Sequence, residues 1–213
     1  MTPAAQLSRR TFGRYLGALP LLALGGGCQL PGTAPPPREF RVTPKTTFEG
    51  LPEVSWSLVV DRPDSDPAID SVRIARLSGV EVAYYAGGLW VDRPPAMIQP
   101  LLIQSFRASD AIEVVGDRRS EIRPDFLLQT RITAFQAEPQ PDAPPDVRVA
   151  IAASLLAMPR REVVGTTEIG YTAPAAAREI EAIATAFDEA LGKVFKRLVE
   201  WTLATGEAAT ATS

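Results

Sequence analysis

A long apolar stripe near the C-terminus is the feature that most constrains the fold of this chain. Its members recur at intervals of three and four residues: Ile180, Ile183, Ala184, Phe187, Leu191, Val194, Phe195, Leu198 and Trp201. This spacing places them on one side of a helix, which we expect to open at residues 172–174. Because a helix gains most of its stability from a covered apolar side, the stripe predicts packing on a sheet. Cover by a partner or a membrane is the alternative. Residues 205–213 are expected to follow as a disordered tail.

Short stretches rich in β-branched and aromatic residues supply the strands of that sheet. Strands are expected at residues 54–60, 71–77, 80–85, 112–115, 126–135, 147–158 and 162–171. The last two form a hairpin around the turn at residues 159–161. In the segment 126–135, every second residue lies on one face of the strand, namely Phe126, Leu128, Thr130, Ile132 and Ala134. Polar residues, namely Gln129, Arg131 and Thr133, lie on the other face. This alternation indicates an antiparallel sheet with one side exposed to water.

A second amphipathic helix is expected between the early and the late strands. Asp92 is placed to cap this helix, and Pro94 and Pro95 fit its first turn. Its apolar side is formed by Ile98, Leu101, Leu102 and Phe106. Strands and helices in this order predict an α+β fold, with two amphipathic helices packed on one face of a mainly antiparallel sheet.

The segment 61–70 gathers acidic residues and invites a calcium interpretation. It reads DRPDSDPAID, with Asp61, Asp64, Asp66 and Asp70. The spacing does not match an EF-hand loop, and the glycine that such a loop needs is missing. The segment therefore predicts a solvated turn.

The composition excludes most enzyme chemistry. The chain has no histidine and one cysteine, so it lacks the commonest general base, the commonest metal ligand and any Ser–His or Cys–His pair. Carboxylates such as those of Glu179 and Glu181 do not face each other on a helix. We therefore expect no catalytic residue, no metal and no cofactor. The net charge of −3 argues against a nucleic-acid partner.

The first 28 residues have the pattern of a bacterial export signal. Arg9, Arg10 and Phe12 belong to a twin-arginine signature, and the apolar run at residues 15–24 is about half the length of a bilayer span. Three glycines then precede Cys28, as in the lipobox of bacterial lipoproteins. We expect cleavage of residues 1–27 and a covalent lipid on Cys28 that anchors the chain. A plain signal peptide with an incidental cysteine is the alternative.

A Pro-rich tether follows the expected anchor at residues 28–39, and Pro35–Pro37 favour an extended polyproline II conformation. Gln29 stands where an aspartate would signal retention in the inner membrane. These features predict a cell-envelope protein, lipid-anchored on the periplasmic side of the outer membrane of a Gram-negative bacterium.

One family combines these parts in the same order. The likeness rests on one stretch of the chain, with Val82–Tyr85, Trp90, Asp92, Pro94–Pro95, Met97–Ile98, Leu101–Leu102 and Ser109. It resembles the ABC-type transport auxiliary lipoproteins, accessory lipoproteins of MCE-type lipid transport systems. The likeness extends over a domain at residues 40–204. Leu89 stands where the family often has Arg, and Pro100 interrupts the helix.

The resemblance implies a non-catalytic component of intermembrane lipid transport. Its partners would be an MCE-domain protein and an ABC permease and ATPase complex, with phospholipid as the cargo and a homo-oligomer favoured by a ring-shaped partner. Aromatic residues make good interface anchors, so a contact patch is expected at Tyr84, Tyr85, Trp90, Pro94 and Pro95. The alternative for Trp90 and one tyrosine is a place at the edge of the core.

Two other functions fit the same anchor and a similar small body. One is an outer-membrane assembly lipoprotein that serves a β-barrel or lipopolysaccharide. The other is a stand-alone lipid shuttle, which would need an apolar cavity between the sheet and the helices.

Overall fold

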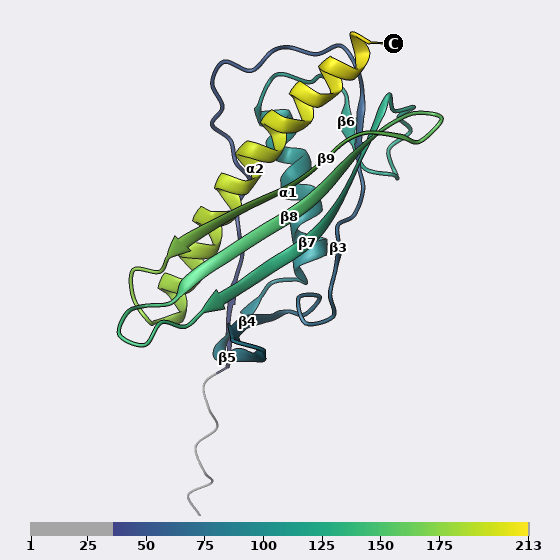
Figure 1. Cartoon of the computed structure of the whole chain (residues 1–213). Coiled ribbons are helices and arrows are strands. Elements are labelled where there is room, and N and C mark those ends of the chain that lie inside the picture. Colours follow the sequence, from purple (N-terminus) through teal and green to yellow (C-terminus); the bar gives the residue numbers. More distant parts are fainter. Residues whose placement is uncertain (1–35, 213) are drawn as a thin grey trace, which may run out of the picture. The chain divides into compact units, whose positions relative to one another are not determined.

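Three long antiparallel strands form the centre of the fold. β7 (Phe126–Glu138), β8 (Asp146–Ala157) and β9 (Glu162–Pro174) pair in this order over almost their whole lengths. The computed structural model describes residues 36–212 (Figure 1). The expected signal with Arg9, Arg10 and Phe12, the expected anchor at Cys28 and most of the tether lie outside these residues.

Shorter strands line the other edge of β7. β2 (Leu58–Val60), β3 (Asp64–Ser65) and β4 (Arg73–Ser78) each pair with it in parallel. β5 (Glu81–Trp90) runs antiparallel to β4, while β1 (Arg38–Phe40) is parallel to β5 and β6 (Val115–Gly116) is parallel to β2. The described residues thus form one sheet of nine strands, in which the long antiparallel pairs predominate.

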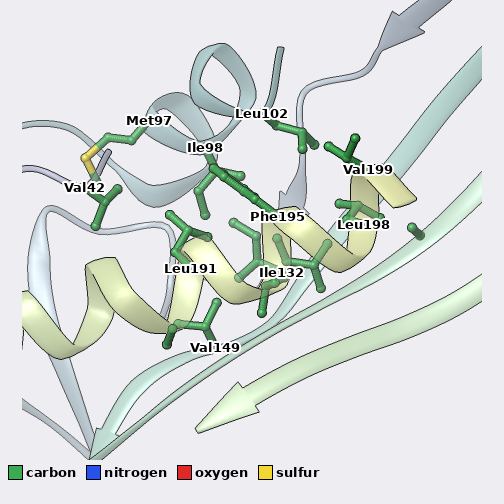
Figure 2. Close-up of a cluster of buried hydrophobic side chains, with 14 of the residues drawn as sticks. Val42, Met97, Ile98, Leu102, Ile132, Val149, Leu191, Phe195, Leu198 and Val199 are labelled. Carbon is green, nitrogen blue, oxygen red and sulfur yellow. The ribbon is translucent and has the colours of Figure 1, made fainter. Parts of the chain in front are cut away.

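Both helices lie on the same side of the sheet (Figure 1). α1 (Pro94–Ala108) follows β5, and α2 (Ile180–Thr210) ends the described chain. α2 packs on β7, β8 and β9, whereas α1 contacts β2, β6 and α2. Figure 2 shows side chains of both helices meeting those of the sheet, with Leu102 on α1, Phe195 on α2 and Ile132 on β7. Full burial of such a side chain is worth about 1.5–3 kcal/mol, so these contacts stabilise the fold. Two helices on one side of a mainly antiparallel sheet confirm the predicted α+β fold.

α2 begins later than the sequence indicates. β9 continues through residues 172–174, where Thr172 pairs with Arg148 and Pro174 pairs with Asp146. Proline is tolerated there because it ends an edge strand, where its missing N–H costs no ladder hydrogen bond. The helix opens only at Ile180, after Glu179 as N-cap. The expected opening at residues 172–174 is therefore wrong.

α2 also ends later than expected, because its last turns have a packing partner. The helix reaches Thr210, and Thr202, Leu203 and Gly206 are buried. A Cβ atom on Gly206 would lie 2.5 Å from Cζ2 of Trp56, so the helix backbone rests against the indole. Residues 205–210 are thus helical rather than a disordered tail.

A bulge in β7 changes which side chains face the helices. The register with β8 shifts between Ile132 and Ala134, so the alternation expected from Phe126 breaks there. Phe135 enters the core in the place that was expected for Ala134. A bulge adds one unpaired residue to the strand, so each side chain after it lies on the opposite face of the sheet from the one expected.

α1 begins as its prolines indicate but without the expected cap. Arg93 is the N-cap, with Pro94 and Pro95 in the first turn. The Asp92 carboxylate instead accepts a hydrogen bond from the Arg93 N–H at 2.7 Å. Pro100 lies inside α1 on an exposed position, where its ring avoids the core. Neither helix within residues 36–212 is long and apolar enough to cross a bilayer.

Two glycines of α2 provide a matched test of this packing. Gly206→Ala forces a methyl group against the buried Trp56, and we expect it to lower the free energy of unfolding by about 1–3 kcal/mol. Gly192 has no atom within 4 Å of its added Cβ, so Gly192→Ala should raise it by up to about 1 kcal/mol. Urea unfolding measures both. Equal stability of the two variants would contradict the close contact.

Candidate ligand- and partner-binding surfaces

The structure divides the expected contact patch between the core and the surface. Trp90 is 2 % exposed, and its ring lies 5.1 Å from that of Phe187 and 5.4 Å from that of Phe135. Pro94 and Pro95 are buried in the first turn of α1. These three residues stabilise the fold, and their side chains are not available to a partner in this structure.

Tyr84 and Tyr85 keep part of their surface. The Tyr84 ring lies under the guanidinium of Arg73 at 3.8 Å, and its hydroxyl donates to the carbonyl of Ala68 at 3.4 Å. Tyr85 packs against the edge of the core. Burial raises the pKa of its hydroxyl, and the nearby Arg76 opposes that rise. Contact with a partner stays a prediction for these two tyrosines.

A large hollow of the described surface is a groove between the end of α2 and the β8–β9 hairpin. Its volume is about 850 Å³. The lining residues are Trp56, Asp125, Phe126, Ala157, Met158, Glu162, Val163, Val164, Ala204, Thr205, Ala208, Ala209, Thr210 and Thr212. We call this the α2 groove. Most of its walls are small or apolar side chains, which suits an apolar ligand or a partner segment.

Two glycines bring the walls of the α2 groove together. A Cβ on Gly165 of β9 would lie 2.6 Å from Cγ2 of Thr205, and Gly206 touches Trp56 in the same way. The ring of Trp56 packs edge-on against Phe126 at 5.0 Å. Its Nε1–H is buried and has no hydrogen-bond partner among the described residues. Gly165, an isolated glycine inside the expected strand at residues 162–171, was the sequence signal for this close approach.

The outer edge of β9 adjoins the α2 groove. Among the described strands β9 pairs only with β8, so its other edge is open to a further strand. The Arg197 side chain donates to the carbonyl of Gly170 at 3.3 Å. Val163, 55 % exposed, lies where this edge meets the groove. Groove and edge together offer an apolar wall and backbone hydrogen-bonding groups to one partner.

The acidic segment 61–70 is held by arginines. Arg131 pairs with both Asp64 and Asp66, the latter at 2.5 Å, and Arg118 pairs with Asp61 at 2.6 Å. These contacts fix the segment against β7, where it adds the short strand β3 instead of forming only a solvated turn. Within residues 36–212 no cluster of acidic side chains is arranged to hold a metal ion.

The Asp61 ion pair predicts a pH dependence of stability. Its hydrogen bond from Arg118 is the main cause that holds the pKa of Asp61 below its ordinary value, and Gln129 adds to it. A carboxylate with a lowered folded-state pKa stabilises the fold above its unfolded pKa, and this contribution is lost as the pH falls. We expect Asp61→Asn to be less stable than the wild type at about pH 6 and to approach it at about pH 3. Urea unfolding across this range measures the difference, and a constant difference would contradict the pairing.

Two solved structures share the fold of this chain. Protein XCC0632 from Xanthomonas campestris is 28 % identical, with a TM-score of 0.74 over 82 % of this chain and 99 % of that one. An uncharacterized protein with 10 % identity shares the fold at a TM-score of 0.61, over 78 % of this chain and 97 % of its own. No curated protein matches the chain.

The family comparison is more specific. The family described as the ABC-type transport auxiliary lipoprotein component matches residues 41–199. The matched range runs from the end of β1 through most of α2, so it contains nearly the whole of the core. The chain therefore belongs to the family of ABC-type transport auxiliary lipoproteins.

Proposed function

We propose that this protein is the non-catalytic accessory lipoprotein of an ABC/MCE-type system that moves phospholipid between membranes. The observation that carries the proposal is the match of the auxiliary lipoprotein family to residues 41–199. In this role a lipid on Cys28 anchors the protein on the periplasmic side of the outer membrane. The domain then binds the MCE-domain protein, which an ABC permease and ATPase serve from the inner membrane.

The tether sets how far the domain reaches. Ten residue steps separate Cys28 from Arg38, where β1 begins, and an extended chain spans at most about 3.3–3.6 Å per residue. β1 therefore begins within about 35 Å of the anchored cysteine. That distance suits a component that holds a partner beside one membrane.

The α2 groove is the proposed binding site for the MCE-domain protein. It offers a large, mostly apolar hollow beside an open strand edge, a combination that supports docking of a partner segment through side chains and backbone together.

Lipid binding in the same groove is the second candidate function. Met158, Val163 and Val164 give one wall an apolar surface that an acyl chain could contact. A lipid shuttle would be recovered with bound lipid and without protein partners. An accessory component would be recovered with the transport complex.

Purification of the tagged full chain from native membranes tests this function. In gentle detergent we expect an MCE-domain protein to accompany the wild type together with the permease and ATPase. Val163→Arg should reduce that recovery by about tenfold or more, because an unpaired guanidinium in a buried contact costs more than about 1.4 kcal/mol. Mass spectrometry with labelled standards measures the ratio.

Val114→Arg is the matched control. Val114 is 42 % exposed and lies outside the α2 groove, so the same substitution there should leave recovery unchanged. Equal losses in both variants would refute the groove as the docking site. Recovery of only a β-barrel protein, or of lipid alone, would replace the proposed function with outer-membrane assembly or lipid shuttling.

A further inference from the structure

A small pocket lies at the other end of the sheet from the α2 groove. It has a volume of about 150 Å³ and is lined by Arg76, Tyr85, Arg178 and the β7–β8 connection. The connection and the β8–β9 hairpin leave opposite ends of β8, so the pocket and the groove are separate surfaces. We call this the arginine pocket.

The two arginines of the pocket have no carboxylate partner. Among residues 36–212, neither Arg76 nor Arg178 takes part in an ion pair, whereas the pairs present engage Arg38, Arg93, Arg118, Arg131 and Lys196. The residues that line the pocket include no acid. The nearby carboxylate of Asp146 accepts a hydrogen bond from the side-chain amide of Gln140 at 3.0 Å and forms no ion pair with either arginine. The pocket thus holds two guanidinium groups that are not used in ion pairs of the described residues.

Each side of the arginine pocket is positioned by the fold. Arg76 lies on β4 opposite Ala83 of β5 and beside Ala137 of β7. The Arg178 guanidinium donates to the carbonyl of Pro141 at 3.2 Å, which ties it to the β7–β8 connection and leaves its other N–H groups free. The Tyr85 hydroxyl is protonated at neutral pH, since burial raises its pKa, and it supplies a third donor.

We propose that Arg76, Tyr85 and Arg178 bind a phosphate group. Guanidinium groups present several N–H donors in a planar fork that matches phosphate oxygens, and charge-assisted bonds of this kind are the strong ones. The pocket has room for several waters, each of which occupies about 30 Å³ in the liquid, and hence for a phosphate. This inference does not depend on which protein occupies the α2 groove.

The entry of the chain favours a phospholipid headgroup as the source of that phosphate. β1 is parallel to β5, with Arg38 opposite Gly88, so the chain approaches β1 from the side of the β4–β5 hairpin. That hairpin also carries Arg76 and ends in the wholly exposed Val80. The end of the domain at which the chain enters β1 therefore presents both the arginine pocket and an apolar tip.

Titration of the full chain in nonionic detergent tests the site. The probes are inorganic phosphate and dihexanoyl phosphatidylglycerol, each followed by calorimetry. We expect saturable binding that weakens about tenfold or more in Arg76→Gln and in Arg178→Gln, because each removes a charge-assisted bond. Tyr85→Phe, which deletes only the hydroxyl, should weaken binding by less.

Arg160→Gln is the matched control, because Arg160 is an exposed arginine in the β8–β9 turn at the opposite end of β8. It should bind both probes as the wild type does. Tighter binding of the phospholipid would identify a headgroup as the source, and tighter binding of inorganic phosphate would identify a soluble one. Absence of binding, or equal binding by wild type, Arg76→Gln and Arg178→Gln, would overturn the proposal.

Discussion

The packing of α2 across β7, β8 and β9 is the interaction on which the rest of the structure depends. Its centre is a triangle of aromatic rings, in which Phe187 of α2 lies 4.8 Å from Phe135 of β7 and 5.1 Å from Trp90. Trp90 ends β5 and is paired with Phe40 of β1. The triangle therefore joins the three long strands β7, β8 and β9 to β5 and to β1, through which the chain enters the domain.

Periodicity predicted the elements but not their limits. The stripe from Ile180 to Trp201 was sufficient for α2, because helical spacing is a local property of the sequence. The two ends of that helix depend on partners far along the chain. Pro174 stays in β9 because Asp146 pairs with it, and Gly206 stays helical against Trp56. The bulge after Ile132 likewise depends on the pairing with β8, so no local pattern indicated that Phe135 would replace Ala134 in the core.

The candidate surfaces were harder to predict than the fold. Aromatic composition drew attention to Trp90, yet a large ring at the end of a strand is equally suited to closing a core, and the structure places it there. The α2 groove combines Trp56 with residues of β9 and the last turns of α2, which lie far apart in the sequence. Tyr85 was found from the sequence, but the two arginines beside it come from β4 and from the segment before α2.

The two surfaces suggest a division of roles between the ends of β8. The arginine pocket lies at the end where the chain enters β1, and the α2 groove lies at the other end of β8. Photo-cross-linking in native membranes from position 163 tests the proposed function most directly, with position 82 of the β4–β5 hairpin as the reference. We expect capture of an MCE-domain protein from position 163 and not from position 82. Capture of that protein from neither position, or of a β-barrel protein alone, would contradict an accessory role in lipid transport.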